Sequence, residues 1–393
     1  MKILFITPTL PARISRIRAY NLIKCLSGNH EVHLLSFIDS NTKKNKIEEI
    51  KKFCTSIDTV LLPKWKSFLS CILYLFTNIP LRVSYCKSGA MKKKIGELLA
   101  KEKFDVVYIK RKRMAQYGEY ITGIPKVLDL TDAVSMYYSR AYKYSNPLKK
   151  IYFFIEYHKL LKYEIRITRK FDKVVLSSAV DAEFLNKNSG GDLKNLVVIP
   201  NVVDTEYYSP KNIKSEENSL LFSGIMRNFV NIDSAVYFCR NIFPLILKEI
   251  PDTKLYIAGP KPPLSVRRFS KCGNIIVTGY VDDLRDYIEK SEIIICPIRV
   301  GAGTRNKILQ AMSFGKPVVS TCLGAEGLKV TDNENILIAD TSREFAEKVI
   351  ILLKDKTMRE KIGMNAKRFV CAKYSLDILK EKINMLLDNY LKK

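Results

Sequence analysis

Residues 293–312, IIICPIRVGAGTRNKILQAM, are the stretch that decides the fold of this 393-residue chain. An aliphatic run, typical of a strand buried on both faces, leads into a turn that contains Gly301 and Gly303. The turn opens a helical pattern that Gly315 and Pro317 bring to an end. A strand, a glycine-rich turn and a helix in this order predict one βα unit of a parallel sheet.

The same pattern repeats on both sides of a polar stretch at residues 211–219, KNIKSEENS. Short aliphatic runs separated by amphipathic stretches predict strands joined by helices. These runs lie at 3–6, 32–37, 57–62, 106–109, 127–130, 174–176, 196–199, 220–223, 255–258, 275–278, 293–297, 317–320 and 336–339. Two such sets predict two Rossmann-like α/β domains, in which ligands bind beyond the carboxyl ends of the strands.

The glycine-rich turn is the first candidate site, because a glycine turn and a helix N-terminus together bind anions. Thr304 is the expected N-cap of the helix, which puts Arg305 and Lys307 in its first turn. The helix dipole disfavours cations there, and a bound phosphate would remove that conflict. The alternative is a tight turn with two solvated basic side chains.

Two further glycine turns follow predicted strands in the second half of the chain. Gly224 follows the run at 220–223, and Arg227, three residues later, would neutralise a leaving diphosphate. Gly279, in VTGYVDDL, would hold a base ring through backbone contacts. Purely structural turns are the alternative in both places.

Two carboxylates follow a predicted strand in the first half. The run at 127–130 brings Asp129 and Asp132 to a strand end, where one of them would bind an acceptor hydroxyl or act as its base. The alternative is that Asp132 caps the next helix and that Asp129 is structural. Further upstream, Ser15 is the expected N-cap of the first helix.

The net charge of +26 is concentrated in the first half, where residues 1–200 hold 36 Lys/Arg and 17 Asp/Glu. Such an excess attracts nucleic acid, anionic lipid or phosphorylated substrates, unless it only reflects solvated lysine-rich faces. No helix-turn-helix, RNP or zinc-finger pattern supports nucleic acid. The aromatic and basic stretch 142–171, the basic run 110–113 and the apolar run 68–76 favour an anionic membrane surface. Ordinary packing with lysine stems along apolar surface is the alternative.

Cysteine usage and the first residues bear on location. Nine scattered cysteines without a C-x-x-C pair, with only three histidines, argue against a metal site and for a reducing compartment. The opening MKILFITPTL lacks the layout of a signal peptide, and the run at 68–76 is far shorter than a membrane-spanning helix. We therefore expect a cytoplasmic protein, peripheral on the inner face of the cell membrane.

Together these segments resemble bacterial glycosyltransferase family 4, in particular the exopolysaccharide-associated subgroup of sugar transferases. The resemblance rests on segments spread over the chain, among them KILFITPTLP, VLDLTDAVSMYY, RKFDKVVLSSAVDAEFL, LFSGIMRNFVNIDSAVYF and RVGAGTRNKILQAMSFGKPVVSTCLGAEGL. It implies the GT-B fold, with two Rossmann-like domains facing across a deep cleft. Residues 1–205 would bind the acceptor, 206–370 would bind the nucleotide-sugar, and 371–393 would form a helix packing back towards the first domain.

The resemblance also implies residue roles on the donor side. Those expected at the donor diphosphate are Gly301, Gly303, Thr304, Lys307, Arg227 and Arg299. Gln310 is expected at the nucleotide ribose, Glu326 close to the donor, and Gly279 at the base. Retention at the anomeric carbon is implied, with no metal and no cofactor besides the nucleotide-sugar co-substrate.

On the acceptor side, the chain departs from the family in the loop after the first strand. Ile14 and Ser15 replace a glycine pair, and Arg16 and Arg18 are expected to substitute for it through their side chains. Ser178 follows the strand that family members use to line the cleft.

The predicted function is transfer of a sugar from a nucleotide-sugar to a surface polysaccharide or a glycolipid. Lys307 and Arg227 would stabilise the leaving diphosphate, and the acceptor proton would pass to a phosphate oxygen or to Asp132. Ala302 and Gln310 stand where the family has an acidic pair, which favours a catalytically degenerate GT-B subunit that binds a glycan or a partner protein as the alternative. A basic nucleic-acid-binding protein and a sugar-nucleotide epimerase of the same fold are the remaining alternatives.

Overall fold

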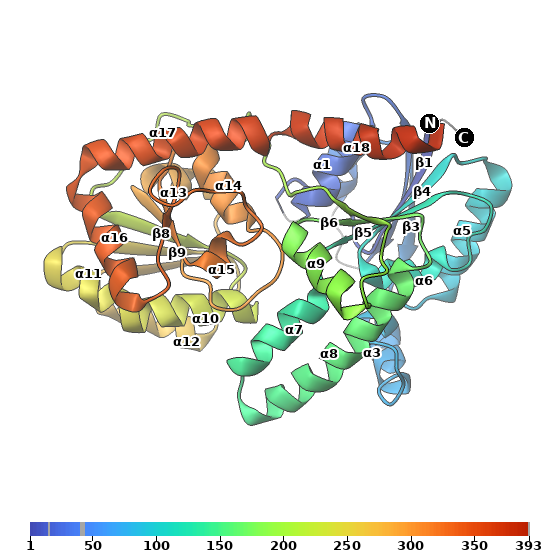
Figure 1. Cartoon of the computed structure of the whole chain (residues 1–393), viewed down its shortest axis with the longest axis horizontal. Coiled ribbons are helices and arrows are strands. Elements are labelled where there is room, and N and C mark those ends of the chain that lie inside the picture. Colours follow the sequence, from blue (N-terminus) through green and yellow to red (C-terminus); the bar gives the residue numbers. More distant parts are fainter. Residues whose placement is uncertain (15, 40–43, 392–393) are drawn as a thin grey trace. The chain divides into compact units, whose positions relative to one another are not determined.

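The computed structural model describes residues 1–14, 16–39 and 44–391 and divides the chain into two compact units (Figure 1). Unit 1 comprises Met1–Pro200 and Leu379–Lys393, and unit 2 comprises Asn201–Ile378. The sequence-based divisions after residues 205 and 370 therefore differ from the observed ones by five and eight residues. Tyr374 explains the second difference, because its ring is buried in unit 2 and its carbonyl accepts a hydrogen bond from the Val203 amide (2.9 Å).

Unit 1 is built on a seven-stranded sheet in which every described pairing is parallel, in the order β3-β2-β1-β4-β5-β6-β7. Its strands are β1 (Lys2–Thr7), β2 (Glu31–Ile38), β3 (Ser56–Leu61), β4 (Val106–Lys110), β5 (Lys126–Thr131), β6 (Lys173–Leu176) and β7 (Leu196–Val198). The strand order reverses beside β1, which is the point where ligands bind in open sheets of this kind.

Helices connect these strands and pack around the sheet of unit 1 (Figure 1). They are α1 (Ile17–Leu26), α2 (Lys44–Lys51), α3 (Lys64–Leu73), α4 (Leu81–Ser84), α5 (Gly89–Lys101), α6 (Lys112–Gly118), α7 (Val134–Lys143), α8 (Pro147–Thr168) and α9 (Ala179–Asn188). The longest, α8, is capped at its start, because Asn146 accepts a hydrogen bond from the Lys149 amide and Pro147 follows it.

Unit 2 holds a six-stranded parallel sheet in the order β10-β9-β8-β11-β12-β13. Its strands are β8 (Ser219–Ser223), β9 (Lys254–Ala258), β10 (Ile275–Gly279), β11 (Ile293–Cys296), β12 (Val318–Ser320) and β13 (Leu337–Ile338). All thirteen predicted strands are present. The inner strands are buried on both faces, whereas β3, β7 and β10, at the edges of the two sheets, are partly exposed.

The helices of unit 2 enclose its sheet, and the last helix returns to unit 1. They are α10 (Phe229–Tyr237), the π-helical turn η1 (Phe238–Ile242), α11 (Phe243–Glu249), α12 (Leu264–Arg267), the 3₁₀ turn η2 (Arg268–Cys272), α13 (Leu284–Lys290), α14 (Asn306–Ser313), α15 (Cys322–Ala325), α16 (Ser342–Lys354), α17 (Lys356–Lys373) and α18 (Leu376–Leu391). The core of this unit includes Phe222, Phe238 and Phe345, which are fully buried.

The C-terminal helix spans the division between the two units, because Leu379–Lys393 belongs to unit 1 although α18 begins in unit 2. Among the described residues, no helix has the length and apolar character needed to cross a bilayer. The predicted N-cap Ser15 lies outside the described residues; Arg16 occupies the N-cap position of α1 without a side-chain capping bond.

Candidate functional site

The glycine-rich turn lies between β11 and α14, at the carboxyl edge of the unit 2 sheet. Gly303 has a φ of 74°, a left-handed conformation that favours glycine. The predicted N-cap Thr304 is wrong, because α14 begins at Asn306 and Arg305 is its N-cap. The first carbonyl to accept a helical bond belongs to Arg305, which receives the Ile308 amide (3.0 Å), so the helix starts one residue later than expected.

Several polar atoms of this turn are buried without a hydrogen-bond partner among the described residues. They are Nε and Nη2 of Arg305, Oγ1 of Thr304 and Oδ1 of Asn306. Arg305 uses only Nη1 within the protein, donating to the Ala302 carbonyl (3.0 Å). Buried polar atoms are nearly always satisfied in folded proteins, and the Arg305 nitrogens and the Thr304 hydroxyl can donate, so they suit a ligand with acceptor oxygens. Asn306 Oδ1 is itself an acceptor.

Gly301 allows the Arg305 side chain to lie in the turn. A Cβ at position 301 would lie 1.8 Å from Arg305 Nη2, so any side chain there would displace the guanidinium. From the sequence, Gly301 is expected to let a ligand approach the backbone. The structure gives it a different contact, because Gly301 leaves room for a guanidinium.

Lys307 extends from the first turn of α14 toward β8. Its Nζ donates to Asn231 Oδ1 (3.2 Å) and lies 4.2 Å from the ring centroid of Phe222. The pKa of Lys307 is lowered to about 8, mainly by burial; Cys296 opposes the shift and the charge of Arg305 adds to it. A nearby anion would favour the charged form and restore the pKa.

Three glycines end adjacent strands beside this turn. Gly224, Gly259 and Gly279 follow or end β8, β9 and β10, and backbone bonds join Gly224 N to Ala258 O (2.9 Å) and Gly259 N to Gly279 O (2.8 Å). A Cβ on Gly259 would lie 1.8 Å from the Gly224 carbonyl oxygen, so the strand ends can approach this closely only without side chains. Sequence analysis missed Gly259, although the pair Gly259-Pro260 directly after a strand signals such a turn.

Two arginines predicted at the diphosphate differ in their surroundings. Arg227 is exposed in the turn before α10, and its guanidinium makes no hydrogen bond or ion pair to another described residue. Arg299 binds Asp233 of α10 through Nη2 (2.8 Å) and Nε (3.2 Å) and lies 4.1 Å from the ring centroid of Tyr237. Asp233 and Tyr237 were missed, because spacing in sequence does not show which helix faces a turn.

The two remaining residues predicted on the donor side, Gln310 and Glu326, lie in the helix before β12 and at the end of the helix after it. Gln310 is buried within α14, and its side chain makes no hydrogen bond to another described residue. Glu326 is partly exposed at the C-terminal end of α15. Ala302, at the first position of the family's acidic pair, is partly buried in the glycine-rich turn.

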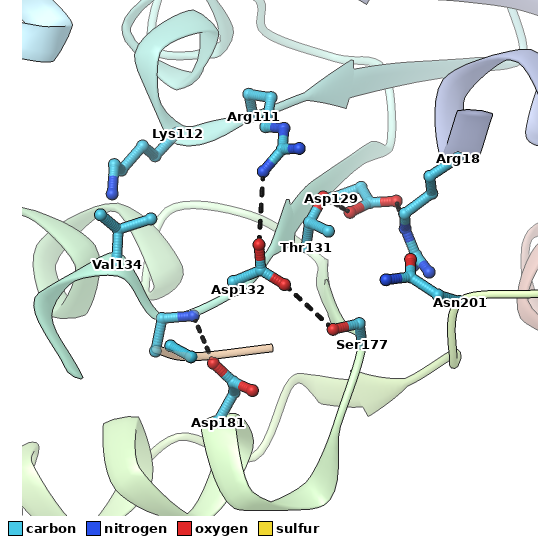
Figure 2. A network of polar contacts seen from close by, with 12 residues as sticks. Arg18, Arg111, Lys112, Asp129, Thr131, Asp132, Val134, Ser177, Asp181 and Asn201 are labelled. Atoms are coloured by element: carbon cyan, nitrogen blue, oxygen red, sulfur yellow. Dashed lines mark hydrogen bonds and ion pairs between the residues drawn. The ribbon is translucent and has the colours of Figure 1, made fainter. Parts of the chain in front are cut away.

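In unit 1, Asp132 lies just beyond the carboxyl end of β5 (Figure 2). Its Oδ1 accepts a hydrogen bond from Ser177 Oγ (3.1 Å), and its Oδ2 lies 3.5 Å from Arg111 Nη1. The alternative that Asp132 caps the next helix is wrong, because the N-cap of α7 is Ala133 and no side chain caps that helix. Asp132 is held at the strand edge and remains partly exposed.

Two non-glycine residues beside Asp132 have left-handed backbone conformations. Arg111 follows β4 with a φ of 73°, and Thr131 ends β5 with a φ of 71°. A β-branched residue in this region is strained, and such strain concentrates at functional sites. The Thr131 carbonyl accepts the Ser177 amide (2.7 Å), which holds the ends of β5 and β6 together.

Asp129 belongs to a buried network rather than to an open site. Arg18 Nε (3.0 Å) and Tyr108 Oη (3.1 Å) reach its Oδ2, while Lys110 Nζ (2.8 Å) and Thr131 Oγ1 (3.0 Å) reach its Oδ1. Burial opposes ionisation of Asp129, but the charges of Arg18 and Lys110 outweigh it and hold the pKa of the carboxyl well below its usual value. Burial lowers the pKa of Lys110.

The structure therefore places Arg18 in an internal ion pair, where it also donates to the Pro200 carbonyl (2.9 Å). Arg16 is exposed and donates from Nε to Thr9 Oγ1 (2.9 Å). Ser178 is buried and caps α9 by accepting the Asp181 amide (3.1 Å). Ser177, one residue earlier, is the serine that contacts Asp132.

A second buried ion pair, between Lys112 and Glu164, lies next to the same strand edge. Lys112 Nζ donates to Glu164 Oε1 (2.9 Å), and Glu164 also accepts the Val134 amide (3.0 Å) and Ser135 Oγ (2.6 Å). Asp181 similarly accepts the Ala133 amide (2.7 Å), as Figure 2 shows. Buried carboxylates on α8 and α9 thus fix the backbone that follows Asp132.

Comparison with known proteins connects the unit 2 edge to a family. Residues 217–355, which contain the whole unit 2 sheet and its glycine turns, match the family model for Glycosyl transferases group 1. An uncharacterized 44.6 kDa protein in the cps region of Klebsiella pneumoniae is 26% identical over 259 residues, covering 63% of this chain and 65% of that protein. The capsular polysaccharide biosynthesis glycosyltransferase CapM of Staphylococcus aureus is 22% identical over 238 residues, covering 56% of this chain and 62% of CapM.

The fold itself extends to solved structures. Anabaena HepE in complex with UDP matches 99% of this chain and 100% of its own, at a TM-score of 0.70 and 14% identity. The predicted fold class is confirmed: two Rossmann-like α/β units with parallel sheets match GT-B glycosyltransferase structures. The match spans less than two thirds of the length of each of the two curated relatives.

Proposed function

We propose that this chain is a retaining glycosyltransferase of family 4, of the exopolysaccharide-associated subgroup, which transfers a sugar from a nucleotide-sugar to a polysaccharide or lipid-linked glycan. The observation that carries the proposal is the set of buried, unpartnered donors of Arg305 and Thr304 at the N-terminus of α14. The similarity of residues 217–355 to group 1 glycosyl transferases supports it. HepE, which shares the fold, was solved with UDP.

On the donor side, the diphosphate would bind at the glycine-rich turn. Arg305 offers two unused N–H groups, and the amides at the start of α14 add the positive end of the helix dipole. Lys307 and the exposed Arg227 would balance the remaining negative charge. With these cations and main-chain donors, the site is proposed to work without a resident metal or cofactor.

The nucleoside would lie along the ends of β8, β9 and β10. Gly224, Gly259 and Gly279 expose backbone there, which suits a flat base held by main-chain contacts. Gln310 and Glu326 are proposed to lie at the ribose and near the sugar. Arg299, held by Asp233, is proposed to flank the diphosphate with a fixed orientation.

On the acceptor side, unit 1 is proposed to bind the accepting hydroxyl near Asp132, with Arg16 at the rim of the site. In the reaction, the bond from the anomeric carbon to the diphosphate oxygen breaks, and a bond to the acceptor oxygen forms on the same face. The acceptor proton passes to a phosphate oxygen of the leaving nucleoside diphosphate or to Asp132. Electrostatic stabilisation of the leaving diphosphate is the main catalytic contribution.

The proposed location is the cytoplasm, on the inner face of the cell membrane. All nine cysteines are free thiols, as a reducing compartment maintains them. A lipid-linked or growing surface glycan would be available to the protein at that face. No nucleic-acid partner is proposed.

A thermal-shift screen with nucleotide-sugars tests the donor assignment. A ligand that binds only the folded protein raises Tm, and a hundredfold excess over Kd adds about 2.7 kcal/mol to the free energy of unfolding. We expect one nucleotide-sugar to raise Tm in the wild type and the shift to be lost in Arg305→Ala. Arg343→Ala, which removes an exposed arginine of α16, is the matched control and keeps the shift.

Transfer is then measured with the nucleotide-sugar that binds, against membranes or extracted polysaccharide as acceptor. Formation of nucleoside diphosphate together with labelled glycan supports a transferase. Binding without either product would favour the degenerate subunit, and an altered free nucleotide-sugar would favour an epimerase. No shift with any nucleotide-sugar would overturn the donor site.

A further inference from the structure

Helix α3 of unit 1 packs on the protein with its polar face. Ser67 is buried, Ser70 Oγ donates to the Ser84 carbonyl (2.8 Å), and Cys71 Sγ donates to the Leu81 carbonyl (3.5 Å). The opposite face and the turn after it expose large apolar side chains. These are Trp65, Phe68, Leu69, Ile72, Leu73, Leu75 and Phe76, with Leu73 75% and Phe76 95% exposed. This is the reverse of the arrangement that water favours.

The first turns of α8 also expose large apolar side chains to water. Leu148, Ile151, Tyr152 and Ile155 are exposed at i, i+3, i+4 and i+7, so they form one stripe on the helix surface. Leu148 is 82% exposed and Ile151 is 61% exposed. The inward side of α8 carries Glu156, a buried carboxylate that accepts the Leu81 amide (3.2 Å). α3 thus directs its polar face inward, whereas α8 buries Phe153 and Leu160 beside Glu156 and exposes a second apolar stripe at its start.

The two exposed apolar stripes belong to one surface. Lys159 of α8 donates to the carbonyl of Leu75, just after α3 (2.7 Å), and the Glu156–Leu81 bond joins the same two segments. In Figure 1, α3, α7 and the first turns of α8 extend from the same side of unit 1, at the lower edge of the view. We call the exposed apolar residues of α3, its following turn and the start of α8 the apolar face.

The charge around the apolar face has a single sign. Residues 59–88 contain four Lys/Arg and no Asp or Glu, and residues 133–155 contain four Lys/Arg and no Asp or Glu. Lys64, Lys66 and Lys149 are exposed among the apolar side chains. The basic run at 110–113 does not contribute as predicted, because Lys110 and Lys112 are buried in ion pairs.

We propose that the apolar face docks unit 1 onto the interface of an anionic lipid bilayer. Aromatic and aliphatic side chains would enter the acyl boundary, while the surrounding lysines contact anionic headgroups. A second copy of this basic chain would gain from the apolar residues but would bring the same cations against one another. The proposal specifies the peripheral location proposed above, and its test does not depend on sugar transfer.

Vesicle flotation tests the apolar contribution. The wild-type protein is floated with phosphatidylcholine vesicles and with vesicles that also contain phosphatidylglycerol, and binding is expected only to the latter at physiological salt. The double variant Leu73→Ser/Phe76→Ser should lower the partition coefficient at least tenfold. Leu264→Ser, at a 76% exposed position of unit 2, is the matched control and should bind like the wild type.

A charge variant tests the lipid headgroup contribution. Lys64→Gln/Lys149→Gln should lower the partition coefficient about fivefold for each lysine, because a basic residue near an anionic surface contributes about 1 kcal/mol. Lys271→Gln in unit 2 is the control. Dextran sulfate, a soluble polyanion, distinguishes binding to a bilayer from binding to any polyanion. The proposal is wrong if the protein binds dextran sulfate but not vesicles, and if the Leu73→Ser/Phe76→Ser variant still binds dextran sulfate.

Sedimentation velocity distinguishes a second copy of the chain from a bilayer. If wild-type protein dimerises without binding vesicles and Leu73→Ser/Phe76→Ser makes it monomeric, the apolar face is a dimer interface and the proposal is wrong. The Tm shift with the nucleotide-sugar found above should persist in all of these variants. Its loss would indicate misfolding of the variant, and its absence from the wild type would contradict the donor site but not the membrane surface.

Discussion

At the scale of single residues, the cations around α14 differ in how the protein holds them. Arg299 is fixed by Asp233, Arg305 is buried with unused donors, and Lys307 rests on Phe222 with a lowered pKa. A site that binds a diphosphate benefits from both kinds of cation, because fixed charges cost no reorganisation. Because its pKa is lowered to about 8, Lys307 changes its charge close to neutral pH.

Lys307 is expected to matter for turnover. Lys307→Ala removes a charge next to the proposed leaving group and should lower kcat about 10²-fold, as loss of one transition-state donor does elsewhere. Steady-state kinetics with the identified nucleotide-sugar measure the change, with Arg343→Ala as the control for surface charge. Unchanged kcat in Lys307→Ala would remove this residue from the site.

The pKa of Lys307 also predicts a pH dependence. The side chain is protonated below about pH 8 and neutral above it, so the affinity for a nucleotide-sugar should fall as pH rises through about 8. Isothermal titration between pH 7 and 9.5 should show a Kd that rises by up to about tenfold per pH unit above that point. Lys307→Arg keeps its charge over this range, so its profile should be flatter. Equal slopes in both proteins would contradict the assignment.

Gly259 is expected to tolerate no side chain. Gly259→Ala places a methyl group 1.8 Å from the Gly224 carbonyl oxygen, so the ends of β8 and β9 must separate. We expect the free energy of unfolding to fall by about 3 kcal/mol, as for other overpacked sites. Gly96→Ala is the comparison, because no atom lies within 4 Å of that Cβ and alanine favours the helix α5. Chemical denaturation should therefore give opposite signs for the two substitutions.

At the scale of elements, the ends of β4 and β5 are joined to α1 by buried charge. Arg18, Lys110 and Asp129 come from three elements, and their ion pairs are covered by the protein on every side. Such a network adds little net stability, but removing one partner leaves the others unpaired. It holds the strand ends from which Arg111 and Asp132 project.

Asp129→Asn should therefore destabilise unit 1 by about 3–5 kcal/mol, because two buried cations lose their counter-charge. Asp192→Asn, which removes an exposed partner of Arg169, should leave the denaturation midpoint unchanged. The folded pKa of Asp129 lies below the unfolded value of 3.8, so its contribution is present above pH 3.8 and is lost as pH falls below it. Acid unfolding should accordingly begin at higher pH in Asp129→Asn, and coincident acid transitions would refute the role of the network.

Elements also show which local predictions hold. All thirteen strands lie where aliphatic runs predict them, and the inner strands of both sheets are buried on both faces, which demands apolar side chains. The start of α14 was predicted one residue early, since Thr304 is a good N-cap residue whose hydroxyl the fold buries instead. Capping preference is a weak local effect, and packing of the glycine-rich turn around Arg305 overrides it.

At the scale of the whole molecule, the last helix starts in one unit and ends in the other. α18 begins at Leu376 in unit 2, and its residues from Leu379 onward belong to unit 1. Leu379, Ile383 and Leu387 are buried there. The C-terminal segment is thus part of the unit that contains the N-terminus.

Leu387→Ala should weaken unit 1 selectively. The leucine is fully buried, and its truncation should cost about 2–5 kcal/mol through lost contacts and a cavity. Hydrogen exchange should accelerate in β1–β7 while β8–β13 keep their protection. Met385→Ala, at an exposed position of the same helix, controls for helix propensity. Faster exchange confined to unit 2 would show that α18 does not stabilise unit 1.

The sequence by itself determined the strands, the two-unit plan and the glycine turns. These features depend on local composition: apolar runs must be buried, and tight strand ends need glycine. Only the tertiary structure decided which charged side chains are used in ion pairs and hydrogen bonds inside the protein. Arg18 and Ser178 were expected on the acceptor side, and Lys110 in a basic run that favours a membrane surface. In the structure, Lys110 and Arg18 pair with Asp129, Ser178 caps α9, and Ser177 contacts Asp132. The tertiary structure also decided that α3 and the start of α8 expose apolar side chains. Which face of a helix is covered depends on neighbours distant in the sequence.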